Sequence, residues 1–196
     1  PKSCVPGDIP MKIMKEFMFE FAEPATIMIN KVIQSAEWPR QWIVEQTIVL
    51  SKSKSKQPQT EDDLRTISKT QWLSKLLENI LGDIILPIID KYIDPGQCGG
   101  LKQSSITHYL VKLLDFIQST LDKREPHCVV LSVEDLSKAY NRGSHRLVIE
   151  DLHVMHVPGW TLAILCSYLS ERSMVLTYQQ ARSIQKPLPG GFPAGA

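Results

Sequence analysis

The sequence predicts an α/β (α+β) fold that is mostly helical and carries a small sheet. Two observations support this class. Long segments repeat apolar residues at the 3.6-residue period of an amphipathic helix, and a few short runs rich in Ile and Val separate them. Such alternation is typical of α/β and α+β folds. The chain has 196 residues, of which 43% are hydrophobic and 22% charged, so its composition is that of an ordinary globular protein.

The N-terminal part is predicted to form two helices, an aromatic turn and a strand. Pro10 opens a helix over about residues 11–21, because proline is well tolerated at the first helical position. Pro24 is expected to start a second helix that runs to residue 33. Trp38, Pro39 and Trp42 form a turn with aromatic anchors, and the Ile- and Val-rich run over 43–50 predicts a strand.

A charged loop, a long helix and a capped helix are expected next. The loop over 51–63 carries Lys52, Lys54 and Lys56, which are interpreted as solvated charges, with binding of an RNA backbone as the alternative. A helical period over 73–84 predicts a helix that Pro87 breaks or kinks. After a Gly- and Pro-rich loop, Ser104 or Ser105 caps a helix. The predicted inner face of that helix is Leu110, Val111, Leu114, Ile117 and Leu121.

The C-terminal part is predicted to begin with a buried strand. The run over 128–133 is short and apolar, as expected of a strand covered on both faces, and it ends at Asp135. The remaining expected elements are two helices and a hairpin, over residues 144–155, 160–169, 174–179 and 183–186.

Composition limits the classes of partner. Lys and Arg number 22 against 21 Asp and Glu, so the whole chain has no basic bias that points to nucleic acid, although local basic stretches can still bind phosphates. Four cysteines without paired spacing argue against a zinc site or a disulfide framework, and they fit an intracellular setting, in cytoplasm or nucleus. No apolar run approaches the ~18 residues of a membrane span, so no membrane partner is expected.

The segment from Val129 to Asn141 holds the most informative candidate site. A strand that ends in a carboxylate, here Asp135, can hold Mg²⁺, a hard cation that prefers oxygen ligands. Tyr140, five residues later, would place an aromatic ring beside whatever the metal binds. The alternative is that Asp135 caps the following turn with its side-chain oxygen. On the residues alone the cap is favoured, because one Asp is a weak metal signal.

The same segment resembles the first palm motif of reverse transcriptases from non-LTR (LINE-type) retrotransposons. It reads Asp135-Leu-Ser-Lys-Ala-Tyr-Asn141, followed by Arg142 and His145, where the family usually has Asp-Phe-Ser-Lys-Ala-Phe-Asp and a His four residues later. Other segments resemble further motifs of the family in the same order and extend the resemblance over essentially the whole chain. They are residues 37–42, 62–68, 97–108, 157–160, 168–173 and 188–195.

The resemblance implies part of a right-hand polymerase fold. The chain would be a single reverse-transcriptase domain fragment over 1–196, with 1–127 mainly fingers and 128–196 the first part of the palm, including a small palm sheet. The implied partners are an RNA template, a DNA primer and deoxynucleoside triphosphates. The motif that normally carries the paired catalytic aspartates would lie beyond residue 196.

The resemblance also implies roles for four residues. Asp135 would be one of the carboxylates that hold two Mg²⁺ ions during nucleotidyl transfer. Tyr140 would be the aromatic gate against the 2′-hydroxyl of an incoming nucleotide. Arg65 and Lys102 would contact its triphosphate from the fingers. On the residues alone, Arg65 and Lys102 are more simply interpreted as solvated surface charges.

Two hypotheses for function follow. The first is an RNA-directed DNA polymerase domain that uses Mg²⁺ in the complete enzyme. The alternative is a catalytically inactive retroelement remnant that acts as a nucleic-acid-binding or protein-interaction module. Asn141 and Ala194 replace the family's usual Asp and Gln, and one carboxylate cannot build a two-metal site. The isolated chain is therefore expected to be inactive, and an incomplete palm sheet would make it poorly soluble or partly molten.

Overall fold

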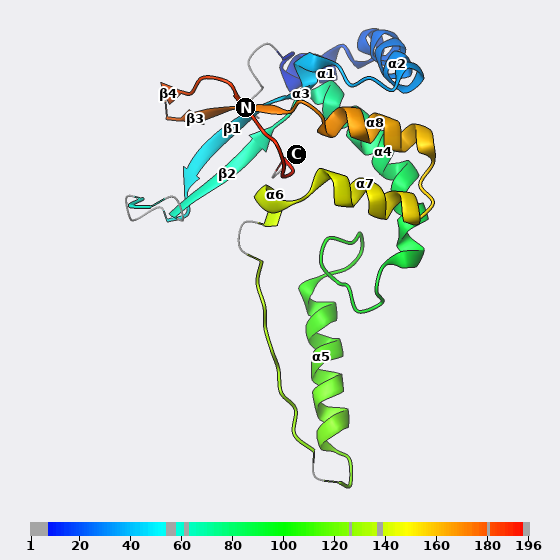
Figure 1. Cartoon of the computed structure of the whole chain (residues 1–196), viewed down its shortest axis with the longest axis vertical. Helices are drawn as coiled ribbons and strands as arrows, with labels where there is room; N and C mark the ends of the chain where they lie inside the picture. Colours follow the sequence, from blue (N-terminus) through cyan, green and yellow to red (C-terminus); the bar gives the residue numbers. More distant parts are fainter. Residues whose placement is uncertain are drawn as a thin grey trace. The chain divides into compact units, whose positions relative to one another are not determined.

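The computed structural model describes residues 8–53, 58–60, 63–125, 127–136, 139–179 and 181–193. The chain divides into two compact units (Figure 1). Unit 1 consists of Pro1–Ile88 and Lys138–Ala196, and unit 2 consists of Ile89–Ser137. The assignment of residues 1–127 to fingers and 128–196 to palm stays a prediction.

Two N-terminal helices form as expected, but their boundary differs from the prediction. Helix α1 covers Met11–Glu16 and α2 covers Met18–Ser35, with a break at Phe17. Pro24 lies inside α2 and does not start it. The missing proline N–H costs one helical hydrogen bond. Because α2 buries one face in unit 1, packing outweighs that loss and the helix continues through Pro24.

A mixed sheet lies in unit 1. The described residues contain five strands, which are β1 Val44–Ser51, β2 Leu64–Lys69, β3 Ser173–Tyr178, β4 Ala181–Arg182 and β5 Lys186–Pro187. The hydrogen-bonded order is β2-β1-β3-β4, and β5 also pairs with β3. The predicted strand over 43–50 is confirmed as β1, and the predicted hairpin is confirmed as β3 with its short returning strands. Strand β2 was not predicted.

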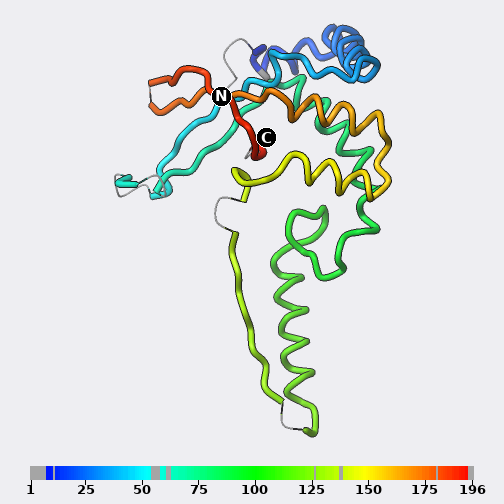
Figure 2. The backbone as a smooth tube through the Cα atoms, viewed as in Figure 1, coloured from blue at the N-terminus to red at the C-terminus, as the bar shows by residue number. Residues whose placement is uncertain are grey.

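The register joins the two ends of the chain. Strand β1 is antiparallel to β2, with Gln46 opposite Lys69 and Ser51 opposite Leu64. Strand β1 is parallel to β3, with Val44 opposite Ser173. Strands β4 and β5 are two short parts of the segment that returns along β3, which Figure 2 shows as a loop in orange and red.

The described part of unit 1 contains five further helices, of which three were predicted and two, over residues 40–43 and 139–142, were not. They are α3 Arg40–Ile43, α4 Trp72–Ile89, α6 Ala139–Arg142, α7 His145–Val154 and α8 Gly159–Leu169. Helix α4 confirms the period over 73–84, but Pro87 does not break it, because the helix ends only at Ile89. Ser144 caps α7 by accepting a hydrogen bond from the Leu147 amide, at 3.4 Å. None of the described helices is both long and apolar enough to cross a bilayer.

The core of unit 1 is built around two tryptophans. The predicted aromatic turn places Trp38 and Trp42 in the core, each 3% exposed, with an edge-on contact at 6.3 Å between ring centroids. Trp38 also packs on Tyr168 of α8, at 4.5 Å, and its amide donates to the Ser167 hydroxyl. The remaining core residues come from α2, α3, α4 and α8, and they are Ile29, Val32, Ile43, Leu77, Leu81, Ile164 and Leu169.

Unit 2 contains the 3-10 helix η2 (Asp90–Tyr92) and helix α5 (Ile106–Leu121). Ser105 is the N-cap of α5 and forms a capping box with His108, which confirms the predicted cap. The predicted inner face is not buried, since Leu110, Val111 and Leu114 are 48 to 63% exposed. Periodicity identified the apolar side of α5 correctly, but it does not determine whether anything covers that side.

The predicted buried strand over 128–133 is wrong. Residues 127–136 have no regular secondary structure, and Val130 and Val133 are more than 80% exposed. Apolar and β-branched residues favour strands only where a pleated, half-buried surface exists for them to pack on. No strand is found in the described part of unit 2, so this segment has no ladder to join there.

Candidate functional site

The four predicted site residues are all exposed. Arg65 lies on β2, opposite Leu50 of β1, and Tyr140 lies on α6 with 63% of its surface exposed. Both belong to unit 1, whereas Lys102 and Asp135 belong to unit 2. Their assignment to one nucleotide and metal site stays a prediction. Of the other residues discussed from the sequence, Lys54, Lys56 and Ala194 lie outside the described residues.

Asp135 is an exposed carboxylate in the irregular segment 127–136. Residues 137 and 138 lie outside the described residues, so the cap that Asp135 was expected to form stays a prediction. The described residues contain no group of three or more His, Cys, Asp or Glu that would hold a metal ion. Magnesium takes several oxygen ligands, so Asp135 alone does not make a magnesium site.

Unit 1 brings together three segments that carry the resemblance. They are β2, helix α6 and the segment 188–193. The Phe192 amide donates to the Tyr140 carbonyl at 2.8 Å, and the Gly191 amide donates to the Gly143 carbonyl at 2.9 Å. The Leu188 amide donates to the Arg172 carbonyl at 2.7 Å. The segment 188–193 is therefore fixed against α6 at one end and against the start of β3 at the other.

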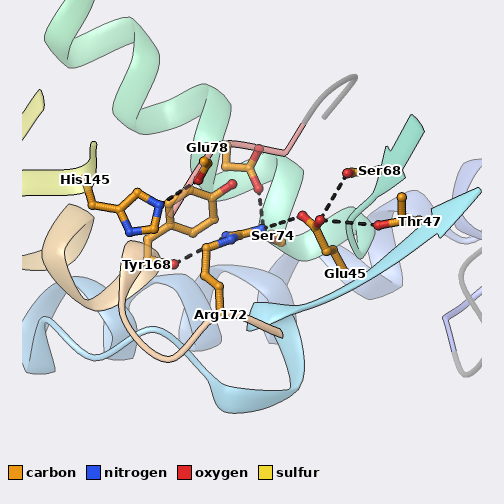
Figure 3. Close-up of polar contacts among 9 residues, drawn as sticks. Glu45, Thr47, Ser68, Ser74, Glu78, His145, Tyr168 and Arg172 are labelled. Atoms are coloured by element: carbon orange, nitrogen blue, oxygen red, sulfur yellow. Dashed lines mark hydrogen bonds and ion pairs between the residues drawn. The ribbon is translucent and has the colours of Figure 1, made fainter. Parts of the chain in front are cut away.

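His145, the first residue of α7, adds a side-chain bond to this contact. Its Nε2 lies 2.6 Å from the Gly191 carbonyl oxygen. A carbonyl only accepts, so Nε2 must carry the proton. The imidazole also lies 5.5 Å from the Phe192 ring, centroid to centroid, at an interplanar angle of 53°. Figure 3 shows the His145 side chain and its hydrogen bond.

Two glycines make this close approach possible. A Cβ atom on Gly143 would overlap the Phe192 ring. Gly191 has φ +82°, and a Cβ there would lie 2.9 Å from the Tyr140 carbonyl oxygen and 3.0 Å from Asn141. A side chain at either position would force segment 188–193 away from α6.

A cavity of about 150 Å³ lies beside this contact. Pockets that hold whole ligands usually measure about 300–1,000 Å³, so this cavity has room for part of a nucleotide at most. It is lined by residues of β1, β2, α6, β3 and the segment 188–193, among them Thr47, Thr66, Ser68, Asn141, Met174, Gly190 and Pro193.

A buried ion pair forms one wall of the cavity. Glu45 of β1 and Arg172, just before β3, lie 3.0 Å apart, with side chains 5% and 1% exposed (Figure 3). Thr47 and Ser68 donate to the same oxygen of Glu45, at 3.3 and 3.2 Å. Because the two charges neutralise each other, this wall offers no free cation to a triphosphate.

The other side of Arg172 packs on Tyr168. The guanidinium lies 4.5 Å from the centre of the Tyr168 ring and donates to the Tyr168 carbonyl at 3.3 Å. Burial raises the pKa of the Tyr168 hydroxyl above its ordinary value, and the negative charge of Glu78 raises it further. Glu78 itself accepts a hydrogen bond from Ser74 at 2.8 Å. These contacts link α4, α8 and the sheet.

The sequence did not indicate the Glu45–Arg172 pair or the role of His145. Residues 45 and 172 are 127 positions apart, and no spacing rule connects them. A charged residue in an Ile- and Val-rich strand is the available signal for Glu45, since such a residue needs a partner if its face is buried. His145 was noted as part of the motif, but its partner Gly191 is 46 positions away.

Comparisons with known proteins found no matching family model. The chain is similar to two curated proteins of Drosophila melanogaster, the probable RNA-directed DNA polymerase from transposon BS and the RNA-directed DNA polymerase from mobile element jockey. Each is 24% identical over 172 residues, which cover 87% of this chain and 18% of the relative. The chain thus spans under a fifth of the length of these relatives. The similarity supports a reverse-transcriptase-related domain.

Proposed function

We propose that this chain is part of an RNA-directed DNA polymerase that copies an RNA template from a DNA primer with deoxynucleoside triphosphates. The observation that carries the proposal is the similarity to two transposon polymerases over 87% of the chain. The contact between α6 and the segment 188–193 adds support, because two segments chosen for their resemblance to family motifs lie against each other.

Tyr140 is proposed as the residue that meets the sugar of an incoming nucleotide. The residue is 63% exposed, while its carbonyl accepts a hydrogen bond from the Phe192 amide. The side chain is thus accessible and its backbone is fixed, which is what a gate against a 2′-hydroxyl requires.

Arg65 and Lys102 are proposed to bind the triphosphate. Arg65 is exposed on β2, and because side chains alternate along a strand it lies on the face opposite to Thr66 and Ser68, which line the cavity. Because Glu45 neutralises Arg172, the buried pair cannot supply the positive charge that a triphosphate needs. In β2, the positive charge for a triphosphate would therefore come from exposed cations such as Arg65.

Asp135 is proposed as one ligand of a magnesium site whose other carboxylates come from a longer protein. Magnesium in such a site would activate the primer hydroxyl and stabilise the leaving pyrophosphate. The described residues provide one candidate ligand, so the chain alone is expected to bind substrates without joining them.

Binding to a primer–template tests the proposal directly. Fluorescence anisotropy with an RNA–DNA hybrid and dATP should give saturable binding, and Arg65→Ala should weaken the binding of dATP by about tenfold or more. Arg146→Ala is a matched control, since Arg146 is 81% exposed and forms a surface pair with Glu150 on α7. Equal effects of both substitutions, or no binding by the wild-type chain, would contradict the proposal.

The alternative function is binding without catalysis, as expected of a retroelement remnant. The replacement of the family's usual Asp and Gln by Asn141 and Ala194 favours it. Primer extension on an RNA template with Mg²⁺ separates the two functions when it is run on a longer protein that contains this chain. Synthesis that Asp135→Ala abolishes supports the polymerase, whereas hybrid binding without synthesis supports the remnant.

A further inference from the structure

We propose that His145 is a positioning residue that fixes the segment 188–193 against α6 and thereby sets where the Tyr140 ring stands. The link to nucleotide selection rests on the proposed function of Tyr140. The positioning of α6 does not, because it follows from contacts within unit 1.

The contact, called the clasp here, consists of three hydrogen bonds between two short segments. On one side are Tyr140, Gly143 and His145, and on the other are Gly191 and Phe192. Two of the bonds join backbone atoms, at 2.8 and 2.9 Å, and the third joins His145 Nε2 to the Gly191 carbonyl at 2.6 Å. The side-chain bond is the shortest of the three.

Helix α6 needs an outside contact to keep its place. Its described part covers four residues, Ala139–Arg142, and isolated helices this short do not form stably in water. None of its residues is buried, so core packing does not hold it. The Phe192–Tyr140 bond holds the backbone of α6, and His145 holds the segment that makes this bond.

The two glycines show that the local sequence accommodates the clasp. A side chain on Gly143 would collide with Phe192, and a side chain on Gly191 would collide with Tyr140 and Asn141. Gly191 also takes a positive φ, which residues with side chains rarely adopt. His145 then adds a directional bond and a ring contact on Phe192, which together select one arrangement of segment 188–193.

The test compares His145→Leu, which removes the donor, with His145→Gln, which keeps an N–H. His153→Leu is the matched control, because His153 lies on the same helix and is exposed. Hydrogen exchange of the Gly191 and Phe192 amides, followed by NMR, reports on the clasp without any nucleotide. Resonances of the Tyr140 ring report on its surroundings.

His145→Leu should speed exchange of the two amides by about three- to tenfold, the factor expected for the loss of one hydrogen bond. It should also shift the Tyr140 ring resonances. His145→Gln should recover much of both effects, and His153→Leu should cause neither. Unchanged exchange would overturn the proposal, and so would equally faster exchange at core amides such as Leu77 and Ile164, because that would mean a general loss of stability.

A second readout tests the link to the nucleotide. The ratio of dATP to ATP affinity should fall by a similar factor in His145→Leu and recover in His145→Gln. If the wild-type chain binds neither nucleotide while the amides respond as expected, the proposed function fails and the positioning role of His145 stands. If both nucleotides bind and the ratio does not change, the proposal that His145 places the Tyr140 gate is overturned.

Discussion

Replacing Glu45 with alanine removes one partner of a buried ion pair and leaves the Arg172 guanidinium charged in the core. The two charged atoms lie 3.0 Å apart, with side chains 5% and 1% exposed. Arg172 would keep its bond to the Tyr168 carbonyl and its place over the Tyr168 ring, but neither contact supplies a negative charge that would replace Glu45. Thr47 and Ser68 would also lose the oxygen to which they donate.

The expected cost is large compared with the stability of a domain. Breaking a buried pair by removing one partner typically costs about 3–5 kcal/mol of the free energy of unfolding. Domains are usually stable by about 5–15 kcal/mol, so Glu45→Ala would remove a substantial part of the total. For a chain of this size each kcal/mol corresponds to roughly 2–4 °C, so Tm should fall by about 6–20 °C.

The pair formed by Arg146 and Glu150 provides a matched control. It has the same separation, 3.0 Å, but its side chains are 81% and 54% exposed. Glu150→Ala should therefore cost less than about 1 kcal/mol. Urea denaturation followed by tryptophan fluorescence measures both variants, since Trp38 and Trp42 lie in the same core and are 3% exposed.

A double variant tests the reason for the loss. Glu45→Leu combined with Arg172→Met removes both charges, so it should recover most of the stability that Glu45→Ala loses. The reasoning would be refuted if Glu45→Ala cost no more than Glu150→Ala. A double variant as unstable as Glu45→Ala would show that the hydrogen bonds of the pair, and not its charge balance, stabilise unit 1.

Three further predictions follow from packing, burial and titration. Gly143→Ala should lower the free energy of unfolding by about 1–3 kcal/mol in urea titrations because its Cβ would overlap Phe192, whereas the control Gly82→Ala, with open space at its Cβ, should have no such cost. Because the pKa of Tyr168 is raised in the folded state, its protonated hydroxyl stabilises the folded chain fully below pH 10, and this stabilisation is lost as the pH rises beyond that value. In urea titrations at alkaline pH, the free energy of unfolding should therefore fall less in Tyr168→Phe than in wild type or in the control Tyr178→Phe, whose tyrosine is exposed. Limited trypsin digestion should cut after Lys123 and Arg124, both exposed, before Arg172, which is buried; early cleavage at Arg172, seen by mass spectrometry, would contradict this order.

The fold could be predicted where a segment carries its own signal. The helical period over 73–84, the Ser105 cap and the Ile- and Val-rich run of β1 each lie within one element, and each is confirmed. Pro24 was wrongly expected to start a helix, and α4 does not break at Pro87, although a kink there stays a prediction. A proline costs a helix one hydrogen bond, and packing of α2 and α4 on the core outweighs that cost.

The contacts around the candidate site were less accessible from the sequence. Strand β2 contains the polar residues Arg65, Thr66, Ser68 and Lys69, which give no strand signal in the sequence. The strand forms because it pairs with β1, and that pairing depends on tertiary structure. The run over 128–133 has the opposite character, with strand-like residues and no regular structure. Both errors arise because β structure is decided by partners elsewhere in the chain.

The parallel pairing of β1 with β3 has a consequence for synthesis of the protein on the ribosome. Glu45 cannot form its ion pair until Arg172, 127 residues later in the chain, has been synthesised. At about 5–20 residues per second, that interval lasts roughly 6–25 s. During this time the β1–β2 hairpin can form while the other edge of β1 stays unpaired, and an unpaired edge of this kind can join strands of other chains. Until β3 emerges, nascent chains of this protein are therefore expected to need a chaperone, or a low concentration of neighbouring chains, to avoid such pairing.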